Sequence, residues 1–423
     1  MKNRLKHIGA LLALAIVPAA TSVYGQVPNG GLDASFGWGG KVVTDFGGTG
    51  DGARCVFLQP DGKLVAAGTT NVNGETDFAL ARYNSNGTLD ASFGNGGKVI
   101  TDFGSFDGVG SAALQLDGKI VAAGWTVFGN VANFALARYN SNGTLDASFG
   151  TNGKVITGFG DVSAQAYAVS LQSDGKIVAA GYANIDGGNE FALVRYTSDG
   201  RLDYSFGTGG RVTTAFGIEQ GFSFAQANSL VVQWDGKIIA AGQAFVGANQ
   251  FALARYNSDG TLDASFGTAG ETTTRIGRND RAFSVALEPD GRIVASGVTN
   301  ADFALVRYNS NGTLDGSFGA GGKVITDFTG SSDAAMAVAI RSDGKIVAAG
   351  QSFVGSSFDF AVARYNSNGT LDPSFGTNGK VTADFNGFNE QAFSVAVQPD
   401  GKTVLAGVAN NNGNADFALA RYQ

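Results

Sequence analysis

The chain has 423 residues, of which 64 are glycine and 43% are hydrophobic, so it can bury a sizeable core and is not a disordered chain. Its formal charge of −7 argues against nucleic acid and anionic membrane surfaces as partners. Its single cysteine, Cys55, excludes an intrachain disulfide.

Residues 1–25 have the layout of a secretory signal peptide. Three cations precede an apolar stretch from Ile8 to Ala20, and small residues lie just before a cleavage point at Gln26. The apolar stretch is about 13 residues long, shorter than the roughly 20 that a membrane-spanning helix needs. We therefore predict that residues 26–423 form the mature protein and that it is secreted, either to the extracellular space or to the periplasm, without membrane insertion.

The rest of the chain is one repeat. Three short sequence landmarks occur seven times each, with a period of 52–61 residues, so we predict one domain over residues 26–423. The Leu-Asp-x-Ser-Phe-Gly landmark contains Asp33, Asp90, Asp146, Asp203, Asp263, Asp315 and Asp372. The Asp-Gly-Lys/Arg landmark begins at Asp61, Asp117, Asp174, Asp235, Asp290, Asp343 and Asp400. The Phe-Ala-x-x-Arg-Tyr landmark contains Arg82, Arg138, Arg195, Arg255, Arg307, Arg364 and Arg421.

One period contains four expected strands. They cover residues 53–59, 63–69, 77–83 and 98–103, and a tight turn at Pro60-Asp61-Gly62 joins the first two. All four are apolar on both faces, which is typical of sheets that are packed on both sides. Seven such units predict an all-β protein, a seven-bladed β-propeller with four-stranded blades. A β-solenoid is the alternative, but its repeats are usually shorter and need end caps.

The two ends of the repeat array predict how the ring closes. A strand of the fourth type, residues 41–46, precedes the first complete repeat, and the chain ends on a strand of the third type, 417–422. A closed ring solves this mismatch, because residues 41–46 complete the last blade and leave no open edge. Arg421 is then expected to approach Asp33 as Arg82 approaches Asp90.

The run Arg82-Tyr83-Asn84-Ser85-Asn86-Gly87-Thr88-Leu89-Asp90 and the Gln-Pro-Asp-Gly-Lys run resemble the delta-60 repeat family, found in secreted and surface proteins of bacteria. The resemblance covers the whole mature chain. It implies propeller blades and implies no particular activity.

Loop content favours one face of the propeller as the binding face. The loops between first and second strands, and between third and fourth strands, are nearly constant, whereas the others vary. We call the face with the second-to-third and fourth-to-first loops the variable face, and the opposite one the constant face. Aromatic rings beside amides and carboxylates suit sugars or a protein surface. The aromatic candidates are Trp125, Tyr182, Phe224, Phe245 and Phe353.

Two sets of polar residues recur on the loops of the variable face. The set that varies most is the better ligand candidate, and its acids, which an acidic mouth would use to attract cations, are Asp51, Asp107, Asp280, Asp333 and Glu390. The set that precedes each third-strand Phe is expected to cap turns. Its members are Asp77, Asn133, Glu190, Gln250, Asp302, Asp359 and Asp416.

The chemistry that the chain lacks argues against catalysis. His7 is the only histidine and lies in the expected signal peptide, so the mature chain has no imidazole base and no histidine metal ligand. The Asn84-to-Asp90 run is similar to a calcium loop, but Arg82 occupies the first ligand position, so a turn is expected. We therefore predict no cofactor and no metal, with calcium as the alternative at that loop.

Taken together, these features predict a secreted, monomeric and non-enzymatic propeller that recognises a surface glycan or protein through its variable face. Two alternatives stay open. One is a glycan-processing enzyme that uses a pair of carboxylates. The other is a structural or adhesive module of the cell envelope.

Overall fold

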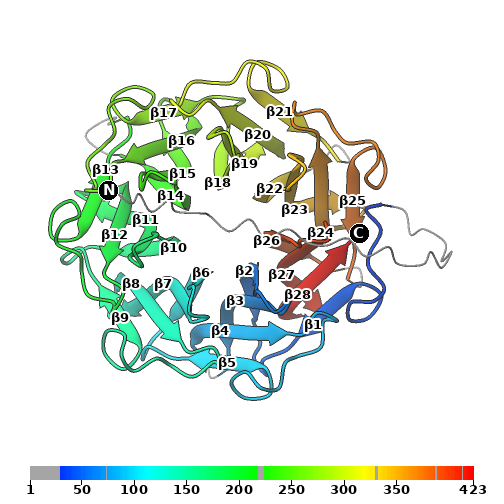
Figure 1. The fold of residues 1–423 in the computed structure, drawn as a ribbon, viewed down its shortest axis with the longest axis horizontal. Coiled ribbons are helices and arrows are strands. Elements are labelled where there is room, and N and C mark those ends of the chain that lie inside the picture. The colour runs from blue at the N-terminus through cyan, green and yellow to red at the C-terminus, as the bar shows by residue number, and fades with distance from the viewer. Residues whose placement is uncertain (1–28, 73, 218–222, 329–331, 386–387, 412) are drawn as a thin grey trace, which may run out of the picture.

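The structure is a computed structural model that describes residues 29–72, 74–217, 223–328, 332–385, 388–411 and 413–423. Seven four-stranded antiparallel sheets are arranged as blades around a central axis, which confirms the seven-bladed β-propeller (Figure 1). The described residues form no helix, and therefore none that could cross a membrane. The predicted signal peptide, residues 1–25, lies outside the described residues.

Each blade runs from an inner first strand to an outer fourth strand (Figure 1). Blades 1 to 3 contain β2 (Gly52–Leu58), β3 (Leu64–Asn71), β4 (Thr76–Tyr83), β5 (Lys98–Thr101), β6 (Asp107–Leu114), β7 (Ile120–Phe128), β8 (Val131–Tyr139), β9 (Lys154–Thr157), β10 (Ala164–Leu171), β11 (Ile177–Ile185), β12 (Gly188–Tyr196) and β13 (Arg211–Thr214). Blades 4 to 6 contain β14 (Ala225–Val232), β15 (Ile238–Phe245), β16 (Asn249–Tyr256), β17 (Glu271–Thr274), β18 (Arg281–Leu287), β19 (Ile293–Thr299), β20 (Asp302–Tyr308), β21 (Lys323–Thr326), β22 (Asp333–Ile340), β23 (Ile346–Val354), β24 (Ser357–Tyr365) and β25 (Lys380–Ala383). Blade 7 contains β26 (Glu390–Val397), β27 (Thr403–Asn411), β28 (Asn414–Tyr422) and β1 (Lys41–Thr44).

The N-terminal strand closes the ring as predicted. β1 pairs antiparallel with β28, with Lys41 opposite Ala420 and Thr44 opposite Phe417 (Figure 1, blue beside red). The strand is shorter than the expected 41–46, because the chain leaves the sheet after Thr44. Phe46 then packs on Phe417, with their ring centroids 4.8 Å apart. The outer strand of every blade is likewise four residues long.

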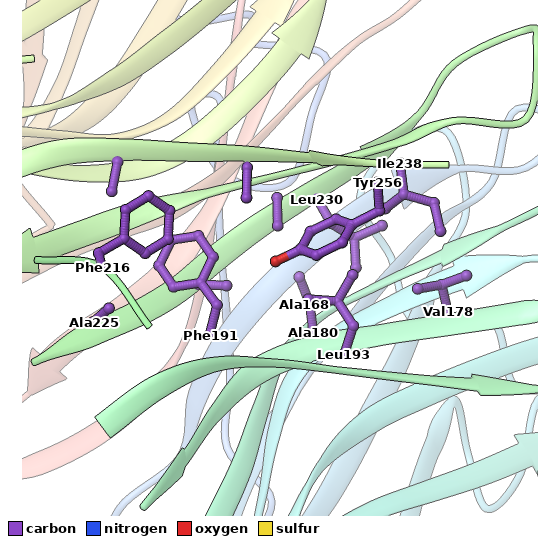
Figure 2. Packing of buried hydrophobic residues seen from close by; sticks show 14 of the residues in the cluster. Ala168, Val178, Ala180, Phe191, Leu193, Phe216, Ala225, Leu230, Ile238 and Tyr256 are labelled. Carbon is purple, nitrogen blue, oxygen red and sulfur yellow. The ribbon is translucent and has the colours of Figure 1, made fainter. Parts of the chain in front are cut away.

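The hydrophobic core lies between neighbouring blades. Figure 2 shows the cluster between blades 3 and 4, where Phe191 and Phe216 lie with ring centroids 4.7 Å apart. The Tyr256 hydroxyl reaches across from blade 4 and lies 2.8 Å from the Thr214 hydroxyl of blade 3. Burial of each such apolar side chain stabilises the folded state by about 1.5–3 kcal/mol. The apolar contacts on both faces of every blade therefore hold the ring together. This is why the strands read as apolar on both sides.

A β-bulge in every first strand shapes the central channel. In β10 the pairing with β11 shifts between Ala166 and Ala168, so Tyr167 is the extra residue. Gly181 of β11 lies opposite this bulge, where a Cβ atom would come within 1.8 Å of the Gln165 carbonyl oxygen. The residues at the seven bulges, which the pairing shifts identify, are Arg54, Gly110, Tyr167, Asn228, Phe283, Met336 and Phe393. All seven line a cavity of about 240 Å³ in the channel.

Candidate functional site

The three sequence landmarks meet around each repeated arginine. In blade 1, Arg82 Nε donates to Asp90 Oδ2 at 2.8 Å, and Lys63 Nζ lies 3.2 Å from the same oxygen. The guanidinium carbon of Arg82 lies 4.6 Å from the centroid of the Phe93 ring. Burial alone would raise the pKa of Asp90, but hydrogen bonds from Ser92 and the two cations outweigh it and hold the pKa well below the usual range.

The same cluster occurs in every blade, including the one that closes the ring. Arg421 Nε donates to Asp33 Oδ2 at 2.8 Å, and Lys402 Nζ lies 2.9 Å from that oxygen. The predicted approach of Arg421 to Asp33 is therefore confirmed. These seven clusters join the third and fourth strands of each blade, so the most regular part of the sequence is structural.

The run that is similar to a calcium loop forms a turn. Asn86 Oδ1 accepts hydrogen bonds from the Thr88 backbone N–H at 3.1 Å and from the Thr88 hydroxyl at 2.8 Å. Asn84 Nδ2 donates to the Thr88 hydroxyl at 3.0 Å, and Asp90 is engaged by Arg82. The side-chain oxygens that a calcium ion would need thus take part in the turn and in the arginine cluster.

Two of the predicted aromatic residues come together on the channel side of the variable face. Trp125 of β7 and Tyr182 of β11 lie on either side of Tyr167, with ring centroids 5.9 Å and 6.0 Å from it. The Tyr167 hydroxyl donates to Gln165 Oε1 at 2.7 Å. We call Trp125, Gln165, Tyr167 and Tyr182 the aromatic patch. All four are partly exposed, and they place two stacked phenols, one indole and one amide at the channel.

A glycine makes room for the indole of the aromatic patch. Gly108 of β6 pairs with Trp125, and a Cβ atom at Gly108 would lie 2.3 Å from the Trp125 ring. The amide surface continues into blade 4, where Gln226 Nε2 donates to Asn228 Oδ1 at 2.7 Å. The patch therefore has hydrogen-bonding groups on one side and flat rings on the other.

The other aromatic candidates lie apart from this patch. Phe224 and Phe245 are 54% and 37% exposed, and the Phe245 N–H donates to the Phe224 carbonyl at 2.9 Å, so they form a pair on blade 4. Phe353 belongs to blade 6, where its ring lies 5.2 Å from that of Phe358. The five predicted aromatic residues thus divide into three locations on blades 2–3, 4 and 6.

The predicted acids do not line an open mouth. Asp51, Asp107, Asp280, Asp333 and Glu390 are all at most 1% exposed and lie at the junctions, where the first strand of one blade meets the preceding blade. Four of them belong to groups of three carboxylates whose nearest oxygens lie within 4.8 Å of one another. We call these groups the carboxylate triads. They are Asp45, Asp51 and Asp416; Asp77, Asp102 and Asp107; Asp302, Asp327 and Asp333; and Asp359, Asp384 and Glu390.

Each triad combines both predicted polar sets with a third residue that the sequence reasoning missed. In the triad between blades 1 and 2, Asp107 comes from the variable set and Asp77 from the set expected to cap turns. The third member, Asp102, follows the fourth strand and is exposed. It was assigned to strand 98–103, but the strand ends at Thr101. The signal was the Asp-Phe pair that recurs directly after four of the fourth strands.

Each triad contains at least one carboxyl group whose pKa is raised above its usual value. Burial, and then the charges of Asp384 and Asp359, raise the pKa of Glu390 to about 8. Burial raises the pKa of Asp107 to about 6, and the charges of Asp77 and Asp102 add to the rise. Two carboxylates about 5 Å apart repel by about 3 kcal/mol at an effective dielectric constant of about 20. Each triad is therefore a concentrated negative charge that burial makes costly.

The fifth predicted acid, Asp280, is different. It accepts from the Ile276 N–H at 2.6 Å, from the Gly277 N–H at 3.0 Å and from the Thr299 hydroxyl at 2.6 Å. Arg275 occupies the position that Asp102 has in blade 1, and its Nε donates to the Gly277 carbonyl. Asp280 thus holds a loop through hydrogen bonds, which is a structural role.

A larger hollow lies on the constant face, where the sequence did not predict a site. It measures about 1130 Å³, and the first-to-second loops of blades 2, 3 and 4 line it. Leu116 and Trp234 stand in the same place of their loops, just before the Asp-Gly turn, and Trp234 is 95% exposed. The signal was an aromatic residue at a position that holds proline or serine in five of the seven repeats.

Comparison with known families decides what the repeat is. The family model described as "Domain of unknown function (DUF5122) beta-propeller" matches residues 59–93, 115–149, 172–206, 233–266, 288–318, 341–375 and 398–423, more than half of the chain. The chain belongs to this family. The seven matches fall one in each repeat; the first six include all three landmarks, and the last, 398–423, includes the Asp-Gly-Lys and Phe-Ala-x-x-Arg-Tyr landmarks.

Solved structures resemble the chain only at a distance. Virginiamycin B lyase from Staphylococcus aureus, in a catalytically inactive form with quinupristin, has a TM-score of 0.48 at 12% identity, over 90% of this chain and 98% of that one. Sqt1 from Chaetomium thermophilum has a TM-score of 0.47 at 13% identity, over 89% and 96%. The polysaccharide lyase Uly1 has 0.47 at 10%, over 88% and 90%. No curated protein matches the chain, and these likenesses carry no argument about function.

Proposed function

We propose that this DUF5122 propeller is a non-enzymatic binding protein that recognises a glycan through the aromatic patch on its variable face. The observation that carries the proposal is the assembly of Trp125, Tyr167 and Tyr182 around one channel mouth, with Gln165 beside them. Flat rings stack on the apolar faces of sugars, and amides supply donors and acceptors for the hydroxyl groups. Pyranose rings present both kinds of surface at once.

The shape of the patch favours a carbohydrate over a flat protein surface. Trp125 and Tyr167 line the channel cavity of about 240 Å³ together with the other bulge residues, and Tyr182 stacks on Tyr167; all three rings are partly buried. A protein partner would engage the outward-facing Phe224 and Phe245 more readily than rings on a channel wall. The end or a branch of a glycan is small enough to enter.

Several features support a binding role over catalysis. The two triad acids with the most displaced pKa values discussed above, Glu390 and Asp107, are fully buried, so a sugar ring has no access to them. A glycosidase pair must flank the scissile bond, with its carboxyl groups roughly 5–10 Å apart and open to the substrate. The sequence offers no histidine after His7 to act as a base.

The proposal includes the setting of the protein. The layout of residues 1–25 supports secretion, and the landmark runs support assignment to the delta-60 repeats of bacterial secreted and surface proteins. A glycan of a cell surface or extracellular matrix is then the ligand class that the protein meets.

A glycan array tests the proposal. The full-length chain is expressed so that the host secretes it, and the purified protein is labelled and applied to the array. Two variants, Trp125→Ala and Trp234→Ala, are prepared and applied separately in the same way. Trp234 is the matched control, because it is an exposed tryptophan on the opposite face. Binding that Trp125→Ala removes and Trp234→Ala keeps supports the proposal. Binding lost only in Trp234→Ala would move the site to the constant-face hollow, and no glycan bound by the wild type would overturn the proposal.

A further inference from the structure

The four carboxylate triads lie at consecutive junctions, from blades 5 and 6 round to blades 1 and 2, on the variable face. Each takes one acid from a third strand, one from the end of a fourth strand and one from the first strand of the next blade. In the first of these triads along the chain, Asp416 and Asp45 of blade 7 meet Asp51, which begins blade 1. Each triad therefore sits where two blades meet.

Lysines near the triads do not neutralise them. At junction 1/2, Lys154 donates to the backbone carbonyl of Asp102, and its positive charge does not prevent the rise in the pKa of Asp77. At junction 7/1, Lys98 Nζ donates to the Asp45 carbonyl at 2.9 Å. These lysines hold the backbone in place, and the carboxylates face one another.

The buried acids of three triads have few partners or none. Oδ1 of Asp333 has no hydrogen-bond partner among the described residues, and Asp333 is 1% exposed. Asp107 and Glu390 are both 0% exposed; within the described part of the chain, Asp107 accepts only from the Thr126 hydroxyl and the Phe103 N–H, and Glu390 only from the N–H groups of Phe385 and Phe388. A buried polar atom without a partner is costly and calls for an ion or other group that satisfies it. Since the same atoms belong to the triads, they point to a missing positive partner.

The seven repeats act as an internal comparison. At four junctions all three positions are acidic, and at the other three no more than one is. If these acids only capped backbone N–H groups, there would be no reason for all three positions of a junction to be acidic together. The corresponding residues at the remaining junctions are Asn133, Gly158 and Ala164; Glu190, Ala215 and Ala225; and Gln250, Arg275 and Asp280.

The second strands preserve the space around the buried acid. Asp51 accepts a hydrogen bond from the Thr70 hydroxyl at 2.6 Å, and Asp333 lies opposite Ser352 in the pairing of β22 with β23. Where the acid is the longer Glu390, its neighbour is Ala409. The smaller neighbour thus leaves room for the longer side chain, so the carboxylate group lies in the triad in both cases.

We propose that each carboxylate triad binds one Ca²⁺ ion and that these ions join neighbouring blades. The ligands are all hard carboxylate oxygens, which suit Ca²⁺ and Mg²⁺. Ca²⁺ fits better, because the buried members require the ion to shed water and Mg²⁺ dehydrates reluctantly. Asp45, Asp102 and Asp384 are exposed, so each of these triads is open to an ion from solvent. When all three carboxyl groups are ionised, a bound Ca²⁺ reduces the charge of each triad from −3 to −1.

Native mass spectrometry of the full-length protein tests the proposal by counting ions. The protein is stripped with EDTA, exchanged into volatile buffer and titrated with Ca²⁺ or Mg²⁺. We expect four Ca²⁺ per chain, one for each triad, and a higher Tm in Ca²⁺. Asp107→Asn and Glu390→Gln should each reduce the count to three. Glu190→Gln, the same type of change at a junction without a triad, should leave four.

Other outcomes overturn the proposal. An ion-free protein in millimolar Ca²⁺, with Glu390→Gln more stable than the wild type, would show that the triads share protons instead. An unchanged count in both triad variants, each shown by circular dichroism to be folded, would place the ions elsewhere. Equal retention of Mg²⁺ at the triads would overturn the assignment to Ca²⁺. The result is independent of glycan binding, which the channel residues carry.

Discussion

Arg421 and Asp33 are 388 residues apart in the sequence, and the Arg421 Nε lies 2.8 Å from Asp33 Oδ2. The Arg421 side chain also donates to the carbonyl of Ser85 in blade 1. The contact between Arg421 and Asp33 is the same as the one between Arg82 and Asp90, which are only eight residues apart in the sequence. The ring therefore closes with the contact that the chain uses inside every blade, but across a far longer loop, whose closure costs more entropy.

Asp33→Asn should destabilise the whole protein, because it leaves the buried guanidinium of Arg421 without its charge partner. We expect the free energy of unfolding to fall by about 3–5 kcal/mol in urea titrations followed by circular dichroism. Asp61→Asn is the control, since Asp61 sits in an exposed turn and should change stability by less than about 0.5 kcal/mol. Equal stability of the two variants would contradict the role of the closing cluster.

The arginine clusters also predict loss of stability in acid. Hydrogen bonds from Ser205 and the charges of Arg195 and Lys176 overcome the effect of burial and lower the pKa of Asp203 to about 2. A carboxyl group with a lowered pKa stabilises the fold above its unfolded pKa, near 3.8, and loses this contribution as pH falls toward 2. The Tm should therefore drop steeply below about pH 4, and a Tm independent of pH in this range would refute the assignment.

The triads predict that the protein loses stability as pH rises near neutral pH. The pKa of Glu390 is raised to about 8 and that of Asp359, chiefly by burial, to about 6. A group with a raised pKa contributes stability below its unfolded pKa and loses it as pH rises through the folded value. In EDTA, the Tm should fall as pH rises from about 5 to 8.

Calcium should remove this neutral-pH trend, and one substitution should weaken it. Saturating Ca²⁺ supplies the charge partner, so the Tm should stay level from about pH 5 to 8 in its presence. Glu390→Gln should make the fall in Tm smaller in EDTA, chiefly between about pH 6 and 8, whereas Glu190→Gln should leave it unchanged. A wild-type Tm in EDTA that rises across this range would contradict the raised pKa values.

Gly108→Ala should impair ligand binding without touching the ligand. The new Cβ atom would lie 2.3 Å from the Trp125 ring, so the indole must move away from Tyr167. We expect glycan affinity to fall about tenfold while the protein stays folded, as measured by calorimetry and circular dichroism. Gly316→Ala is the control, because a Cβ atom there meets no neighbour within 4 Å. Unchanged affinity in Gly108→Ala would argue against Trp125 as a contact residue.

The sequence was sufficient to predict the fold because every blade repeats the same local chemistry. Landmark spacing indicated the number of blades, and the unmatched strands at the two ends predicted closure by β1. The outer strands were predicted too long, because Thr-Asp-Phe continues the strand pattern. In the structure Phe46 turns inward onto Phe417, and Asp45 caps the N–H of Gly47. The packing of the Phe46 side chain on Phe417 therefore ends the strand.

The candidate sites were harder to predict for the same reason. Tyr167 was missed because a β-bulge aims it at the channel, and a bulge breaks the alternation from which side-chain direction is read. Asp102 was missed because its partners, Asp77 and Asp107, are brought beside it by the packing of blade 2 on blade 1. The triads arise from contacts between blades, and a reading within one repeat cannot reveal them.

The most direct test of the account is the affinity of the wild type, Trp125→Ala and Trp234→Ala for one glycan selected from the array. Trp125 lies in the aromatic patch and Trp234 on the opposite face, so the two variants remove the same side chain at different sites. We expect a loss of about tenfold or more, about 1.4 kcal/mol, for Trp125→Ala and no change for Trp234→Ala. Equal affinity of Trp125→Ala and the wild type would contradict it.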